Sequence, residues 1–168
     1  MNLIISLDQA KSTGVSVFEK DHDDWKLIYY DKITSKFEKY EDVIIDLSNK
    51  LTRLIDKYSP DIVLLEDVQN QGNPHTHKNL SMLLGALIVT CNLKHIPYEV
   101  IQCATWRKVL RKNLAYHGKR PQRQEFKNAS REFVKTTFGL KVNDDIAYSI
   151  CIGMYYIRFV LEDGEFDV

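Results

Sequence analysis

The stretch LIISLDQAKSTGVSVF, residues 3–18, decides the fold of this chain. Its first part, Leu3–Leu7, is a continuous apolar run, which predicts a buried central strand that ends at Asp8. Gln9–Gly14 is polar and ends in glycine, so it predicts a turn. Val15–Phe18 then predicts a second strand. The stretch therefore indicates the start of an antiparallel meander.

Strand-like and helix-like segments alternate in the rest of the chain. Apolar residues recur at helical spacing over Tyr40–Tyr58, and Ser59-Pro60 ends that pattern. The other expected strands are Leu27–Tyr30, Asp61–Leu65 and Tyr98–Ile101, and the other expected helices are Lys78–Leu93, Thr105–Leu110, Gln122–Phe138 and a last helix from Asn143 or Asp144 to Arg158. No repeat or linker interrupts the 168 residues, so we expect one α/β domain over residues 1–168.

The composition is that of a globular protein. The chain is 44% hydrophobic and 27% charged, which excludes the disordered, collagen-like and coiled-coil classes. The longest apolar run, Met82–Thr90, is about half of what spans a bilayer, and the N-terminus lacks the basic region of a signal peptide. The isolated Cys91, Cys103 and Cys151 argue against a disulfide scaffold or a structural zinc site. We expect a soluble protein of a reducing cytoplasm.

Basic residues are concentrated in one third of the chain, although the net charge is zero. Residues 101–137 carry ten Lys and Arg against two acids, which is typical of a polyanion binder; a solvated helix face is the alternative. Four of the basic residues lie three to four apart in pairs and can share one helix face. The candidate nucleic-acid contacts are Arg107, Lys108, Arg111, Lys112, Lys119, Arg120, Arg123 and Lys127. Lys119 is also a candidate for stabilising charge at a reacting phosphate.

Carboxylates follow two of the expected strands. Asp8 and Glu66 emerge at the same edge of the sheet if their strands are parallel neighbours, as a crossover through the helix at 40–58 favours. Asp144 and Asp145 open the last helix. Acids gathered in this way repel one another unless a cation lies between them, and carboxylate oxygens suit Mg²⁺ or Mn²⁺. The alternative is that Asp8 is a turn residue and Asp144 a helix cap.

The ordered set LIISLDQAKSTGVSVF, IVLLED, ATWRKVL and NDDIAYSICIG resembles the RuvC-like Holliday junction resolvases, particularly the phage-encoded branch, over residues 2–157. The resemblance implies an RNase H-like fold: a mixed five-stranded sheet, with three antiparallel strands followed by two parallel ones, flanked by helices. It also implies a nuclease that uses two divalent metal ions bound by four acids, which by position are Asp8, Glu66, Asp144 and Asp145.

One residue departs from the family pattern. Many phage relatives read DDIADAICIG here, with a further Asp where this chain has Tyr148. With the family's D-x-x-D spacing, Asp145 matches the first acid and Tyr148 takes the place of the second. A shifted alignment matches Asp144 to the second acid and Lys141 to the first. Either Asp144 and Asp145 both serve, or one is a cap and the site has three acids.

Two further segments bear on partners. The loop Gln69–His77 lacks the aromatic residue that relatives can place at the junction centre, and its His75 and His77 suit a polar loop that faces DNA better than a metal pair. The helix Leu80–Leu93 is apolar on more than one face, so it is buried in its own core or between protomers. Relatives are twofold dimers, and we therefore expect a homodimer.

The resemblance as a whole implies a Mg²⁺-dependent endodeoxyribonuclease, with Mn²⁺ substituting, that resolves Holliday junctions and other branched DNA in a bacterial or phage-infected cytoplasm. A catalytically impaired junction-binding protein is the main alternative. An actin-like ATPase would share the LDQAKSTG strand and turn, but it needs two such domains. A ribonuclease H would share the chemistry, but the resolvase-like TWRKVL segment disfavours it.

Overall fold

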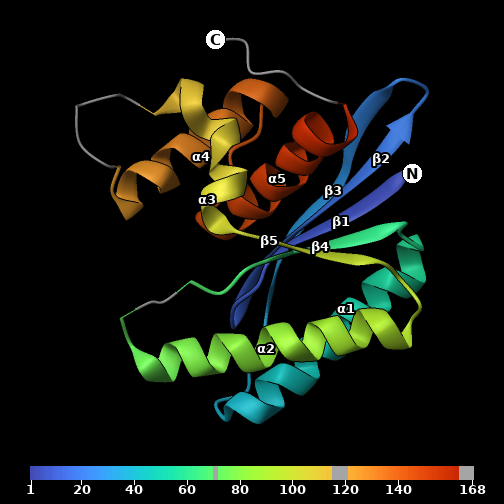
Figure 1. The fold of residues 1–168 in the computed structure, drawn as a ribbon, viewed down its shortest axis with the longest axis vertical. Helices are drawn as coiled ribbons and strands as arrows, with labels where there is room; N and C mark the ends of the chain where they lie inside the picture. The colour runs from blue at the N-terminus through green and yellow to red at the C-terminus, as the bar shows by residue number, and fades with distance from the viewer. Residues whose placement is uncertain (70–71, 115–120, 163–168) are drawn as a thin grey trace.

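A five-stranded mixed sheet forms the centre of the computed structural model, which describes residues 1–69, 72–114 and 121–162. The strand order is β3-β2-β1-β4-β5 (Figure 1). The β1–β2 and β2–β3 pairs are antiparallel, whereas the β1–β4 and β4–β5 pairs are parallel, so the expected fold class is confirmed. The strands are β1 (Leu3–Asp8), β2 (Ser12–Asp21), β3 (Asp24–Thr34), β4 (Ile62–Glu66) and β5 (Tyr98–Ile101).

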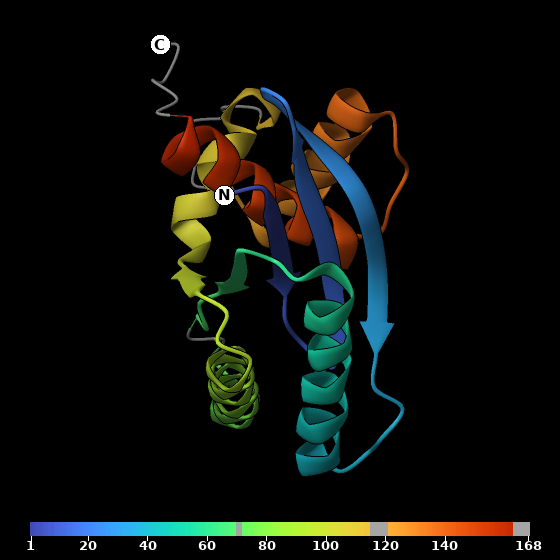
Figure 2. The ribbon, with the colours of Figure 1, turned by 90° about the vertical axis from the view of Figure 1, so that its right-hand side faces the viewer.

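Helices cover both faces of this sheet, and Figures 1 and 2 show α1 and α2 on one side and α3, α4 and α5 on the other. A 3₁₀ helix, η1, continues α3, and a π-helical turn, η2, continues α5. The helical elements are α1 (Tyr40–Tyr58), α2 (Pro74–Leu93), α3 (Cys103–Trp106), η1 (Arg107–Asn113), α4 (Arg123–Phe138), α5 (Asp144–Tyr156) and η2 (Ile157–Leu161). No helix within the described part of the chain is long and apolar enough to cross a membrane.

The core has two layers because side chains alternate along the buried strands. In β1, Ile5 and Leu7 pack toward α1 and α2, whereas Ile4 packs toward α4 and α5. The strands β1 and β4 are buried on both faces, which is why their sequences are continuous apolar runs. Both runs end at a carboxylate, Asp8 or Glu66, where the parallel strands leave the core.

Small residues let α5 lie directly on the sheet. A Cβ atom added at Gly14 would sit 1.8 Å from the Asp145 carbonyl oxygen, and one added at Gly153 would sit 2.3 Å from the Phe18 ring. Between these glycines, the buried Ser6 hydroxyl lies 2.7 Å from the Ser16 hydroxyl and donates to the Ser149 carbonyl. The close approach of α5 brings its first turn to the ends of β1 and β2.

Several element boundaries differ from the sequence-based expectation, and three of them lie near the ends of β1 and β4. β2 begins at Ser12 rather than after Gly14, because Ser12 and Thr13 already pair with β3 and Gly14 pairs with Asp8 of β1. α2 begins at Pro74, because the Asn73 side chain caps it, so the expected polar loop is helical from there on. The next helix begins at Cys103, so Thr105 lies inside it and does not cap it.

Candidate active site

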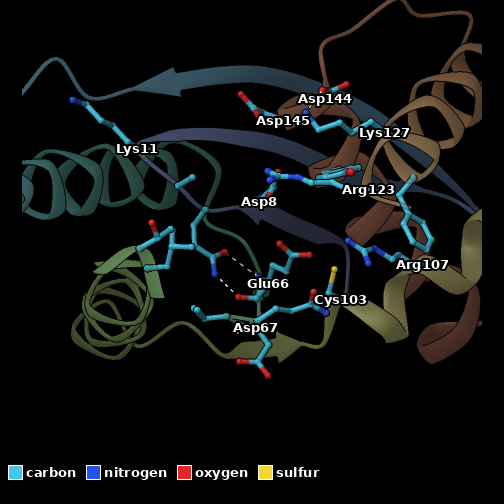
Figure 3. Close-up of a pocket in the computed structure, with 18 of the residues that line it drawn as sticks. Asp8, Lys11, Glu66, Asp67, Cys103, Arg107, Arg123, Lys127, Asp144 and Asp145 are labelled. Carbon is cyan, nitrogen blue, oxygen red and sulfur yellow. Dashed lines mark hydrogen bonds and ion pairs between the residues drawn. The ribbon is translucent and has the colours of Figure 1, made fainter. Parts of the chain in front are cut away.

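A cleft of about 640 Å³ opens where β1 and β4 end. Asp8 from β1 and Glu66 from β4 lie in its centre, and the first turn of α5 forms one wall (Figure 3). The edges of neighbouring parallel strands and a helix N-terminus thus contribute to one cleft. Asp67 also lines the cleft, but it lies on the far side of Glu66 from Asp8 (Figure 3).

Three carboxylates interact in this cleft. Burial raises the pKa of Asp8 well above its usual range, and the negative charges of Glu66 and Asp145 raise it further. The Glu66 side chain also lies within hydrogen-bonding range of Asp8, which raises the Asp8 pKa as well. Arg123 acts in the opposite direction and lowers the Asp8 pKa. The crossover β1-α1-β4 therefore brings Asp8 and Glu66 together, as expected.

The two acids of α5 have different partners. The cap of this helix is Asn143, whose side chain accepts a hydrogen bond from the Ile146 amide, so neither acid is the cap. The Ser12 hydroxyl donates to Asp145 Oδ2 at 3.0 Å, on the side of the cleft that holds Asp8. Asp144 instead pairs with Lys127 Nζ at 2.8 Å and with Arg131 Nη1 at 2.9 Å.

Glu66 is held by groups from two segments, the turn after β1 and the helix α3. Its backbone amide donates to the Gln9 side chain at 3.0 Å, and the Gln9 amide donates back to the Glu66 carbonyl. The Trp106 indole Nε1 donates to Glu66 Oε1 at 2.7 Å. The Cys103 thiol also contacts this carboxylate, and burial raises the pKa of that thiol. These contacts leave Glu66 little rotational freedom on the side of α3.

Sequence reasoning missed the contact of Gln9 and Cys103 with Glu66, because neither residue has a partner near it in the chain. Trp106 is fully buried, as expected for a core anchor, and its bond to Glu66 is an additional role. A polar residue directly after a strand-ending acid, as Gln9 is, was the one signal available. The three cysteines are free and buried, as expected.

The structure separates the basic residues that were expected to share a helix face. Arg107 turns into the cleft, where its guanidinium lies 4.1 Å from the Phe126 ring centroid. Arg111 and Lys112 are exposed on η1, while Lys108 is half-buried. The difference arises because a 3₁₀ helix has three residues per turn and spreads these side chains differently from an α-helix.

The other basic candidates fall into two groups. Arg123 and Lys127 come from the first turns of α4 and line the cleft beside Asp8 and Asp144 (Figure 3). Lys119 and Arg120 lie outside the described residues. His75 and His77 lie in the first turn of α2, where His77 Nδ1 is 3.3 Å from the Gln69 carbonyl. They therefore sit on a helix and not in the expected loop.

The acids of the cleft have the chemistry of a site for a hard divalent cation. Within the described residues, no three His, Cys, Asp or Glu side chains are close enough to hold a metal ion as they stand. However, Asp8 and Glu66 are in contact, Asp145 lies within range to raise the Asp8 pKa, and all three offer oxygen ligands. A cation placed between them would relieve the repulsion among the carboxylates.

Comparison with known proteins identifies a family whose model matches most of the chain. The family model described as crossover junction endodeoxyribonuclease RuvC matches residues 4–124. A crossover junction endodeoxyribonuclease RuvC of Caldicellulosiruptor saccharolyticus is 26% identical over 153 residues, which cover 86% of this chain and 85% of the relative.

Solved structures with the same fold include two resolvases. A T. thermophilus RuvC in complex with Holliday junction substrate superposes with a TM-score of 0.71 at 14% identity, over 95% of this chain and 97% of the other. The yeast mitochondrial Holliday junction resolvase Ydc2 superposes with a TM-score of 0.60 at 17% identity, over 93% of this chain and 78% of the other. At these identities the likeness concerns the fold.

Proposed function

This chain belongs to the RuvC family of crossover junction endodeoxyribonucleases, and from that premise we propose that its cleft cuts four-way DNA junctions by metal-dependent hydrolysis of phosphodiester bonds. The reaction adds water across the P–O bond and leaves a 5′-phosphate and a 3′-hydroxyl. Forks and flaps present similar branch points, so they belong to the proposed substrate range.

The meeting of Asp8, Glu66 and Asp145 at one end of the sheet carries this proposal. Three carboxylates in a half-buried cleft are unfavourable on their own, as the raised Asp8 pKa indicates. Such an arrangement costs stability in the free protein. It becomes favourable once a divalent cation binds, which is typical of a catalytic metal site.

We propose that Asp8, Glu66 and Asp145 hold the metal, with Mg²⁺ as the ion and Mn²⁺ able to replace it. Asp144 forms ion pairs with two cations of α4, so its proposed role is to fix the position of α4 beside the site rather than to bind the metal. The family resemblance implies two ions per site. Three acids suffice for two ions when phosphate oxygens of the bound DNA complete their coordination.

The protein's own groups then orient the reaction. A divalent ion supplies Lewis-acid activation of water and neutralises charge on the phosphate. Gln9 and Trp106 fix the Glu66 carboxylate, and Ser12 fixes the Asp145 carboxylate. Arg123, next to Asp8, adds positive charge on the side from which DNA would approach. These contacts keep the ligands in place before substrate binds.

We also propose a homodimer, with α2 at its interface. Met82, Val89 and Leu93 are 40%, 55% and 75% exposed, and their spacing of seven and four residues places them on one face of α2. Gly85 adjoins this stripe with open space above it. A twofold dimer suits a four-way junction, because two opposed nicks need two sites related by a dyad.

Cleavage of a labelled four-way junction tests the proposed function. We expect wild-type protein to make paired nicks on opposite strands in Mg²⁺ or Mn²⁺, and none in EDTA. Glu66→Gln keeps the shape and hydrogen bonding of the side chain while removing its charge, so it should bind the junction and cut at least about 100-fold more slowly. Junction binding without nicks under every metal condition would instead favour a binding protein on a nuclease fold.

A further inference from the structure

Three buried side-chain polar atoms have no hydrogen-bond partner within residues 1–69, 72–114 and 121–162: Tyr40 Oη, Arg107 Nε and Tyr148 Oη. All three residues line the cleft that holds Asp8 and Glu66. A buried donor without a partner costs about 1–3 kcal/mol, so such groups are uncommon in protein interiors. Their presence in one cleft indicates a polar ligand that satisfies them when it binds.

The Arg107 guanidinium is positioned by aromatic rings. It lies 4.1 Å from the Phe126 ring centroid and 5.5 Å from that of Trp106. Contacts with ring faces orient a guanidinium while leaving its N–H edges open for hydrogen bonds. Trp106 also donates to Glu66, so the same indole ring fixes both the arginine and a proposed metal ligand.

Tyr148 presents its hydroxyl to the same part of the cleft. It lies one turn after Asp145 on α5, and residues three apart share a helix face. Its ring packs against Trp106, with the centroids 5.2 Å apart. Arg107 and Asp8 both act electrostatically on this hydroxyl, so it lies within electrostatic range of both groups.

We propose that Arg107 and Tyr148 together bind an oxygen of the scissile phosphate, on the wall of the cleft that Trp106 forms. This inference rests on the proposed function, because it assigns the substrate contact of the same site. A phosphate oxygen accepts hydrogen bonds and carries negative charge, so it satisfies both donors at once. Arg107 thereby differs from Arg111 and Lys112, which lie exposed and suit contacts with more distant phosphates.

Such a contact gives Tyr148 a function at the position where many relatives have an acid. A tyrosine supplies a neutral donor there and a carboxylate supplies a charged acceptor, so the two residues suit different ligands. The cleft therefore offers donors to phosphate, from Arg107 and Tyr148, beside the three acids that are the proposed ligands to metal.

A neutral linkage at the cut site tests this contact without relying on catalysis. The bond cut by wild-type protein in Mg²⁺ is mapped first, and a methylphosphonate then replaces that phosphate in an otherwise identical junction. Junction Kd values are measured in EDTA by fluorescence anisotropy. The ratio of the neutral-junction Kd to the charged-junction Kd should be about tenfold larger for wild type than for Arg107→Gln, because only wild type loses a charged hydrogen bond.

Two further variants distinguish the loss of this phosphate contact from a general loss of positive charge and from a loss of folding. Lys112→Gln also removes one positive charge near α3, but its ratio should equal that of wild type. Tyr148→Phe deletes only the hydroxyl; it should retain the wild-type melting temperature, lower the ratio and slow single-turnover cleavage by about tenfold.

Equal ratios for wild type, Arg107→Gln and Tyr148→Phe would overturn this inference and leave the nuclease intact. Absence of any metal-dependent nick by wild type would overturn the proposed function and the inference with it.

Discussion

At the scale of single residues, Asp8 shows how function and stability oppose each other. Its carboxylate ends a buried strand, touches Glu66 and lies within electrostatic range of Asp145. The folded protein therefore binds a proton at Asp8 more tightly than the unfolded chain does. As a consequence, the metal-free protein should lose stability as the pH rises from the ordinary aspartate range through the raised pKa of Asp8.

Asp8→Asn should remove that loss. In EDTA at neutral pH we expect the variant to gain about 1–3 kcal/mol in free energy of unfolding, because an uncompensated buried charge is gone. It should also lose the stabilisation by Mg²⁺ that wild type shows, together with its cleavage activity. Thermal melts at several pH values, with and without Mg²⁺, measure both effects.

Asp23→Asn, in the exposed turn between β2 and β3, is a control for removing an acid elsewhere. A less stable Asp8→Asn protein would contradict this account of the site.

The adjacent acids of α5 provide a second comparison of single residues. Asp145→Asn should slow junction cleavage by at least about 100-fold and weaken Mn²⁺ binding, because it removes a proposed ligand. Asp144→Asn should stay within about tenfold of wild type in cleavage, because its carboxylate is occupied by Lys127 and Arg131. Single-turnover cleavage rates and Mn²⁺ titrations distinguish the two variants. The reverse order of effects would assign the metal to Asp144.

At the scale of elements, the contact between α5 and the β1–β2 hairpin positions the site. The glycines at both ends of this contact and the serine hydroxyls between them replace large side chains. The helix therefore approaches the sheet closely enough for Ser12 to bond Asp145. A site assembled from two strands and a helix end thus depends on residues that have no chemical role in it.

Gly14→Ala should disrupt this contact. The new methyl group would sit 1.8 Å from a backbone carbonyl, so α5 must move away from β2. We expect a loss of about 3 kcal/mol in the free energy of unfolding, measured by urea denaturation, and a loss of cleavage activity. Gly85→Ala is the matched control, made in a Val89→Glu background because Gly85 adjoins the proposed dimer contact: nothing in its own chain lies within 4 Å of the added methyl group, and alanine should favour the helix by about 1 kcal/mol. Equal stability of the two variants would show that the contact tolerates a larger residue.

At the scale of the whole molecule, the sheet separates two kinds of surface. Helices α4 and α5 cover one face and α1 and α2 cover the other (Figures 1 and 2). The cleft opens at the sheet edge where β1 and β4 end, beside the basic residues of α4, while α2 exposes an apolar stripe. The proposed DNA binding and self-association would therefore use different parts of the molecular surface. Binding through the basic residues should weaken steeply as salt increases.

The apolar stripe leads to a prediction about mass. Wild-type protein should scatter light as a particle of twice 19.6 kDa at micromolar concentration, and Val89→Glu should reduce this to the monomer. Ile28→Glu is the control, because Ile28 is 42% exposed on β3, away from α2. The monomeric variant should still bind the junction, but it should lose paired nicking. A wild-type monomer under these conditions would overturn the proposed dimer.

Local patterns in the chain predicted an α/β domain and the acids that end its central strands, and the family resemblance added the RNase H-like order of the strands. Apolar runs that stop at Asp8 and Glu66, with a helical repeat between them, favour neighbouring parallel strands, and the structure pairs β1 and β4 in this way. These features are local: they depend on periodicity and on residues close in the chain, which a sequence displays directly. The helix at Tyr40–Tyr58 and the strand at Tyr98–Ile101 were predicted with their observed bounds for the same reason.

The orientation of the other side chains in the cleft could be found only from tertiary contacts. Whether Asp144 or Asp145 faces Asp8 depends on how α5 is rotated about its axis. The close contact at Gly14 and the cations of α4 fix this rotation, and both are distant from α5 in the sequence. The direction of Arg107 likewise depends on Phe126, a residue from another helix. Side-chain partners of this kind follow from packing between distant elements, and no spacing along the chain encodes them.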